Sequence, residues 1–264
     1  MAHNLIPLLA ASCLVLTACG GGGTDTGIGA GTGTSVLTPV TVPVLGDPAG
    51  FPVGAAFANV RKQGFSENTT LKQQASPYLD VFKEDRQSIP VSTASGITAS
   101  ATSSVMAGAA NVFGQYLFAA VYTITTRLTF DARFNVTSFV TDGQTYCEGD
   151  GVPNFPEFLT GAESTAQTGN TTTYTCYADA SKASVVDIRK SSYRASLNSD
   201  GTLRYALTYR FLDAAGADNG IYQTTTYAVS RSGRLTPQTV EAFGTYGALS
   251  TASQFLGTYT RHNY

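Results

Sequence analysis

The side chains in this sequence that could perform acid–base chemistry are carboxylates gathered in one segment. They are Glu148, Asp150, Glu157 and Glu163, and no basic residue separates them. A pair of carboxylates can hydrolyse a glycosidic bond, and carboxylate oxygens can also hold Ca²⁺. The spacing of the four follows no calcium-binding loop. We therefore interpret the segment as a solvated loop, with a partner-binding loop and a carboxylate-based hydrolase as the alternatives.

A second set of side chains is positively charged and could bind anions. It consists of Arg189, Lys190, Arg194, Arg204 and Arg210. Guanidinium and ammonium groups form charge-assisted hydrogen bonds with phosphate and carboxylate. This set is a candidate site for an anionic glycan or a lipopolysaccharide phosphate. The alternative is that these charges form the polar face of a sheet or protect a sheet edge from aggregation.

The sequence lacks the residues that most other types of catalysis require. The sequence has two histidines, His3 and His262, and the second lies two residues from the last position. A Ser-His-Asp site and a zinc or copper site both draw on histidine. No glycine-rich phosphate loop follows a strand and opens a helix. We therefore expect no catalytic residue, no metal and no cofactor, and a protein that is not an enzyme.

The composition argues against nucleic acid as a partner and favours strands. The net charge is −2 at pH 7, and 13% of the residues are charged, against about 25% in typical soluble proteins. Nucleic-acid binding requires basic stripes that neutralise phosphates. The many Thr and Tyr residues instead fit a pleated surface, because branched and aromatic side chains pack well there.

The amino terminus has the pattern of an export signal. The apolar run Leu5–Leu16 is shorter than the roughly 20 residues that a membrane-spanning helix needs, and it has the length of a signal-peptide core. The residues Leu16-Thr17-Ala18-Cys19 that end it resemble the lipobox of bacterial lipoproteins. The resemblance implies cleavage before Cys19, diacylglycerol on the Cys19 thiol and palmitate on the new amino terminus. Gly20 in place of Asp implies the outer membrane of a Gram-negative bacterium, and leaves open whether the protein faces the periplasm or the surface.

Two cysteines remain once the signal and the anchor are assigned. Cys13 leaves with the signal and Cys19 takes the lipid, so Cys147 and Cys176 are left in an oxidising compartment, where they are expected to form a disulfide. Closing a loop of about 30 residues would stabilise the fold by roughly 3–4 kcal/mol. The alternative is two separate buried thiols.

The sequence divides into three parts. Residues 1–18 are the signal peptide, and residues 19–50 are a lipidated tether rich in Gly, Thr and Pro. Residues 51–264 are a β-rich extracytoplasmic domain. Within the tether, residues 36–44 could add an edge strand. Ser76–Phe82 could start a short helix, with Ser76 as its cap and Pro77 in the first turn.

Alternating apolar and polar residues predict strands through the rest of the domain. Tyr116–Phe130 has the period of two that a half-buried strand requires, and the turn Asp131–Arg133 leads from it into a strand over Phe134–Thr141. Asn198–Gly201 contains the residues that favour a hairpin turn. The other expected elements are a strand ending at Leu197, a strand over Leu203–Phe211, a loop over Asp213–Gly220, a strand over Ile221–Val229, a turn over Ser230–Gly233 and a last strand over Gln254–Arg261. We therefore expect an all-β, mainly antiparallel fold whose curled sheet forms a barrel, a half-barrel or a sandwich, with at most one short helix.

Cys19 is followed by Gly20–Gly23 and a β-rich domain, which resembles the surface lipoproteins of the transferrin-binding and factor-H-binding type. The tether, the β-rich domain and the lack of catalytic constellations favour a module that is held on the membrane by lipid and binds a protein or glycan partner. The leading hypothesis is a non-enzymatic binding or adhesion module. The alternatives are a periplasmic structural or assembly lipoprotein and, less favoured, a carboxylate-based hydrolase.

The lipid anchor can be tested directly. A Cys19→Ser variant should leave the membrane fraction of the producing cells and lose the mass of the acyl chains, because the thiol that accepts lipid is gone. Fractionation and intact-mass spectrometry of the wild-type and variant proteins measure both effects. A variant that still sediments with membranes and carries the same lipid would refute the assignment.

Overall fold

The computed structural model describes residues 50–73, 80–93, 96–110, 116–141, 145–160, 166–244 and 253–262. In these ranges the regular elements are one short helix and, after it, β-strands. Residues 19–49 of the predicted tether, Cys19 included, lie outside the described residues. Among the described residues, no helix is long and apolar enough to cross a membrane.

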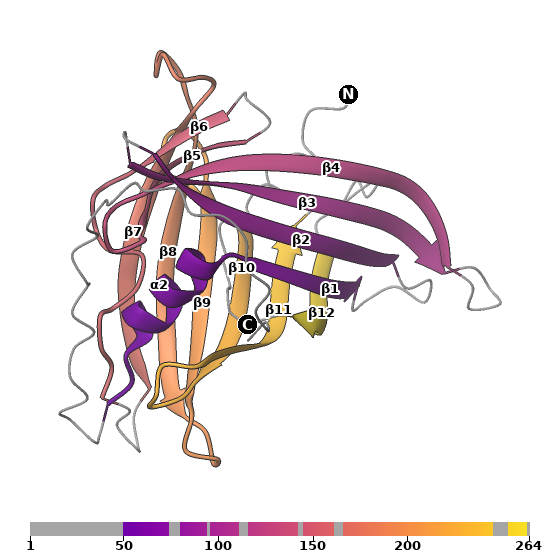
Figure 1. Cartoon of the computed structure of the whole chain (residues 1–264). Helices are drawn as coiled ribbons and strands as arrows, with labels where there is room; N and C mark the ends of the chain where they lie inside the picture. Colours follow the sequence, from indigo (N-terminus) through magenta and orange to yellow (C-terminus); the bar gives the residue numbers. More distant parts are fainter. Residues whose placement is uncertain are drawn as a thin grey trace, which may run out of the picture.

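The strands form a closed antiparallel barrel (Figure 1). Each strand pairs with its neighbours in the chain, and β1 also pairs with β12, where Leu71 lies opposite Gly257. The bounds are β1 Phe65–Gln73, β2 Asp80–Thr93, β3 Gly96–Ala110, β4 Tyr116–Phe130, β5 Val136–Thr141, β6 Thr145–Gly149, β7 Gln167–Tyr177, β8 Val185–Leu197, β9 Leu203–Leu212, β10 Asp218–Val229, β11 Leu235–Gly244 and β12 Ser253–His262. This confirms the predicted all-β class and selects the barrel among the three expected architectures.

Several predicted strands and turns are confirmed at or close to their expected bounds. The period-two segment is β4, Tyr116–Phe130, and the predicted hairpin joins β8 to β9. In its turn, the backbone N–H of Gly201 donates to the carbonyl of Asn198, and Gly201 has a φ of 80°, a conformation that glycine adopts without strain. The Asp200 carboxylate accepts a hydrogen bond from the Thr202 backbone N–H. Local turn chemistry therefore fixes this hairpin.

One predicted helix and two predicted strand boundaries are wrong. The helix expected over Ser76–Phe82 is not formed where the structure describes it, because residues 80–82 belong to β2. β5 begins at Val136, since Phe134 has a φ of 60° and belongs to the turn after β4. β10 already begins at Asp218, inside the expected loop.

The helix that the structure does contain, α2, spans Val53–Gln63 and packs on the inside of the barrel (Figure 1). Its buried face includes Phe57, Val60 and Arg61, at the spacing of an amphipathic helix. The Phe57 ring stacks on Phe155 with centroids 3.7 Å apart, and it meets the Tyr227 ring of β10 edge-on at 5.1 Å. These aromatic contacts place α2 against the inward-facing sides of β9 and β10.

The barrel has an inner wall of buried side chains and an outer wall of exposed ones. Along β9, Leu203, Tyr205, Leu207, Tyr209 and Phe211 are buried, whereas the residues between them are exposed or half-buried. Burial raises the pKa of the Tyr209 hydroxyl to about 12, even though the charge of Arg61 lowers it. The inner tyrosines therefore stay protonated and neutral at physiological pH.

A buried arginine on α2 joins the helix to the barrel. Arg61 is 3% exposed and donates hydrogen bonds to the Phe134 carbonyl and to Asn154 Oδ1. Its guanidinium lies 4.7 Å from the centroid of the Phe155 ring and 5.7 Å from that of Phe130. Burial lowers the pKa of Arg61, and nearby groups, with Tyr174 first, partly offset that shift.

Asn154, the main partner of Arg61, is buried in the loop between β6 and β7. Its Oδ1 also accepts from the Val136 backbone N–H, and its Nδ2 lies within hydrogen-bond distance of Thr172 Oγ1 and the Tyr174 hydroxyl. We call this set of contacts around Arg61 and Asn154 the Asn154 network. It links α2, the start of β5, β7 and the loop residues after β6.

The expected disulfide is formed. Cys147 of β6 and Cys176 of β7 are bonded, and they lie directly opposite each other in the strand register with Cα atoms 4.0 Å apart. Both are fully buried on the inner wall. The bond therefore ties together the two strands between which the Asn154 loop runs.

Replacing both cysteines by alanine should lower the free energy of unfolding by about 3–4 kcal/mol, because the unfolded chain regains the freedom that the cross-link removes. Urea titration followed by circular dichroism measures the difference. The reduced wild-type protein is the matched control and should unfold near the same urea concentration as the variant. A variant as stable as the oxidised wild type would contradict this role.

Candidate binding surface on the outer wall

The structure brings four of the five predicted basic residues to one surface. Lys190 and Arg194 on β8 and Arg204 and Arg210 on β9 are all exposed. They lie on the outer wall because they alternate with inward-facing residues along their strands. We call these four residues the basic strip.

Arg189, the fifth residue of the predicted set, lies on the inner wall. It is 2% exposed and forms an ion pair with Asp187, with Nε 2.9 Å from Oδ1 and a second nitrogen 3.1 Å from Oδ2. Its guanidinium also lies 5.3 Å from the Phe139 ring centroid and 5.6 Å from that of Phe211. Arg189 is therefore part of the core and cannot share a ligand with the basic strip.

The strand register sets the spacing of the basic strip. Lys190 lies directly opposite Arg210, and Arg194 and Arg204 are two residues out of register, opposite Ala206 and Ser196 respectively. The small side chains at these two positions leave a hollow of about 350 Å³ between the two arginines, which Ala166 also lines. The two guanidiniums therefore flank a surface depression.

Charge is only partly neutralised along the strip. Arg210 pairs with Asp218 at 3.0 Å and lies 5.8 Å from the ring centroid of Tyr222. Burial and a hydrogen bond to Glu241 raise the pKa of Tyr222, which keeps this neighbour protonated. Within the described ranges, Lys190, Arg194 and Arg204 have no hydrogen-bond or ion-pair partner.

Unneutralised like charges on adjacent strands destabilise a sheet by up to about 1 kcal/mol per pair. The packing of the barrel does not require them, since they lie on its exposed wall. The arrangement can accept anions, because guanidinium and ammonium groups donate charge-assisted hydrogen bonds to phosphate or carboxylate.

The predicted carboxylate segment is not assembled into a cluster. Glu148 pairs with Lys182, and Asp150 accepts hydrogen bonds from the backbone N–H groups of Val152 and Thr173. Glu157 is exposed beside the start of α2, and Glu163 lies outside the described residues. Among the residues that are described, no three His, Cys, Asp or Glu side chains gather in a metal-binding arrangement.

A larger hollow on the outer wall involves residues that the sequence did not single out. It measures about 730 Å³, lies over β3 to β6 and includes Arg127 and Tyr146 in its lining. The polar face of the predicted strand Tyr116–Phe130 already contained Arg127. The shape of the hollow, however, depends on the curvature of four strands, which no local pattern reveals.

Comparison with known proteins defines no family for this chain. No protein-family model matches it, and no curated protein is similar to it in sequence. Among solved structures it is similar to a crystal structure from Bacteroides fragilis, titled as an exported protein with a YmcC-like fold, at 11% identity and a TM-score of 0.34 over 76% of this chain and 96% of that one. At this TM-score the similarity carries no inference about fold or function.

Proposed function

We propose that this chain is an exported lipoprotein of the bacterial outer membrane and that its barrel is a non-enzymatic binding module. In this proposal the basic strip binds phosphate groups of an anionic envelope polymer. The observation that carries it is the set of three exposed cations, Lys190, Arg194 and Arg204, that have no partner among the described residues.

A polymer that carries several phosphates fits this surface, because the cations are distributed along two strands and are not clustered at one position. The two arginines flank the hollow at Ala206 and Ser196, and a guanidinium can bind a phosphate with two parallel hydrogen bonds. Lys190 and Arg210, opposite each other farther along the same strands, would contact a second anionic group. A polymer with repeated phosphates could thus contact both parts of the strip.

The anchor supports a binding role at a membrane. The lipobox Leu16-Thr17-Ala18-Cys19 would fix the chain to lipid, and residues 20–50 would connect that point to the barrel. A Gly-rich chain of about 30 residues has a mean span on the order of 30 Å. That length lets the basic strip reach polymer beyond the lipid headgroups.

The test compares two triple variants of the full chain in a neutral detergent. In the strip variant, Lys190, Arg194 and Arg204 are each changed to Gln. In the matched control, Lys62, Arg133 and Arg234 are each changed to Gln; these are exposed side chains elsewhere on the protein. Both variants lose three positive charges, so they differ only in where the charge is removed.

Binding to polyphosphate and to purified lipopolysaccharide is measured by titration calorimetry at low and high salt. Loss of several charge-assisted hydrogen bonds should weaken binding of the strip variant by about tenfold or more, while the control changes by less than about twofold. High salt should weaken wild-type binding, since exposed charges are screened. Binding to lipopolysaccharide alone would identify a lipid-linked phosphate as the ligand, and binding to both probes would identify phosphate itself. Equal weakening of the two variants, or no binding of either probe, would refute the role of the strip.

A further inference from the structure

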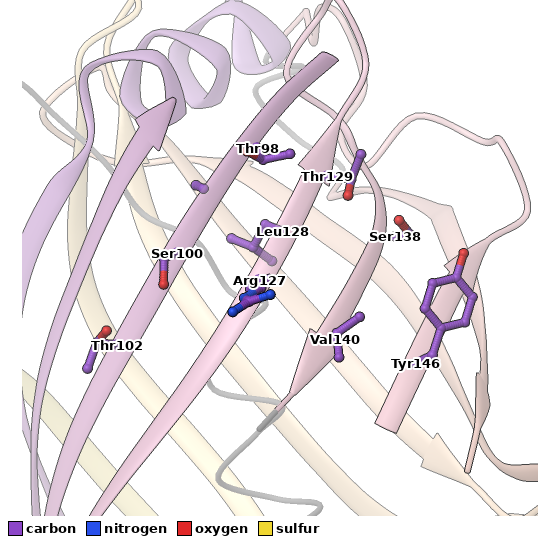
Figure 2. A pocket seen from close by; sticks show the side chains of 10 residues that line it. Thr98, Ser100, Thr102, Arg127, Leu128, Thr129, Ser138, Val140 and Tyr146 are labelled. Carbon is purple, nitrogen blue, oxygen red and sulfur yellow. The ribbon is translucent and has the colours of Figure 1, made fainter. Parts of the chain in front are cut away.

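One hollow on the outer wall is a groove across β3, β4, β5 and β6 (Figure 2). Its volume of about 730 Å³ lies within the range of roughly 300–1,000 Å³ found for ligand sites. Thr98, Ser100 and Thr102 follow one another along β3 on one side of it, and Tyr146 of β6 lies on the other. We call this feature the hydroxyl groove.

The strand register places the central residues of the groove in one line across the sheet. Ser100 lies opposite Arg127, Arg127 opposite Val140, and Val140 opposite Tyr146. A parallel line through Thr98, Thr129 and Ser138 adds hydroxyl groups beside it. Arg127 therefore lies between a hydroxyl-bearing side and an aromatic side, as Figure 2 shows.

Arg127 is the cation of the groove, and the described part of the chain does not neutralise it. It is exposed and has no hydrogen-bond or ion-pair partner there, and no carboxylate lines the groove. Lys182, close to the same edge, is different because Glu148 pairs with it. The groove thus presents a guanidinium that is free to bind an anionic group.

The aromatic side of the groove has contacts of its own. The Tyr146 ring lies 6.4 Å from that of Tyr177, and the Lys182 ammonium, which pairs with Glu148, lies 5.4 Å from the Tyr146 centroid. An aromatic side chain in this position can stack on an apolar face of a ligand.

These features match a sugar more closely than a peptide or a nucleic acid. Hydroxyl side chains both donate and accept hydrogen bonds, as sugar hydroxyls require, and the ring faces of a sugar are apolar. The strands of the groove are paired on both sides, so no free edge is available for a peptide to add as a strand. A nucleic acid would need several cations along its path, and the groove lining contains Arg127 alone.

We infer that the hydroxyl groove binds a polysaccharide segment that carries a carboxylate, as uronic acid sugars do. The Arg127 guanidinium pairs with the carboxylate, Ser100, Thr98 and Ser138 hydrogen-bond to sugar hydroxyls, and Tyr146 contacts a sugar face. This site lies on different strands from the basic strip and recognises a different anion, so it does not depend on the proposed phosphate binding.

The probes are hexamers of galacturonic acid, of guluronic acid and of hyaluronan, and neutral maltohexaose is the comparison sugar. Titration calorimetry uses the full chain in neutral detergent. Wild-type protein should bind at least one of the three carboxylated hexamers more tightly than maltohexaose. Arg127→Met, which keeps the length of the side chain but removes the guanidinium, should weaken that binding by about tenfold or more.

Arg133→Met is the matched control, since Arg133 is an exposed arginine in the turn after β4, and its binding should stay within about twofold of wild type. The strip variant with Gln at 190, 194 and 204 should also bind the hexamers normally, which separates this inference from the proposed phosphate site. Urea titration should show Arg127→Met to be as stable as wild type, because the side chain has no partner to lose. The inference fails if none of the three carboxylated hexamers binds, or if Arg127→Met binds them as wild type does.

Discussion

The fold depends on a buried arginine whose hydrogen bonds, among the described residues, go to neutral acceptors. Arg61 lies between the rings of Phe155 and Phe130 and donates to two neutral acceptors, the Phe134 carbonyl and Asn154 Oδ1. Removing a charge from water costs several kcal/mol, so these contacts must offset a large penalty. Each contact belongs to a different part of the chain, and together they fix α2 against the barrel.

Asn154 connects the helix, through Arg61, to the neighbouring turn and strands. Its backbone N–H donates to Asn135, and its side chain contacts Val136 and Tyr174. The loop that carries Asn154 starts and ends at strands that are joined by the Cys147–Cys176 bond. Helix, turn, loop and strand are therefore joined by one polar network surrounded by aromatic rings.

Concentrating the core on the inner wall leaves the outer wall free for recognition. The inner side of β9 is filled by side chains such as Tyr205 and Phe211, whereas its outer side carries Arg204 and Arg210. Pairing of β1 with β12 closes the sheet, so each of the described strands is paired on both sides. The basic strip and the hydroxyl groove are both built from side chains that the core does not use.

The sequence predicts those features that depend on neighbouring residues. Strict alternation identified β4, and the run from Asn198 to Gly201 identified the β8–β9 hairpin, because strand period and turn chemistry are local. Helix α2 is not among the predicted elements, although its segment has local signals: apolar residues with helical spacing from Val53, and Gly64 with a φ of 78° just after its end. The segment directly follows the predicted tether, which is rich in Gly and Thr.

Other features depend on long-range register and could not be predicted in this way. Arg189 and Lys190 are adjacent, and which of them faces inward is decided by the pairing of β8 with β9 and with β7, and the register with β7 contains bulges. The groove at Arg127 needs the curvature of four strands. The buried position of Arg61 requires the loop at Asn154, more than ninety residues away in the chain.

A double-mutant cycle on Arg61 and Asn154 tests the central claim most directly. The free energy of unfolding is measured for wild type, Arg61→Met, Asn154→Ala and the double variant. If the two side chains act as one unit, each single change should cost about 2–4 kcal/mol, and the double variant should be more stable than the sum of the two losses predicts, by roughly 1.5 kcal/mol or more. Losses that simply add, within about 0.5 kcal/mol, would show that Arg61 and Asn154 stabilise the barrel independently and would contradict this account.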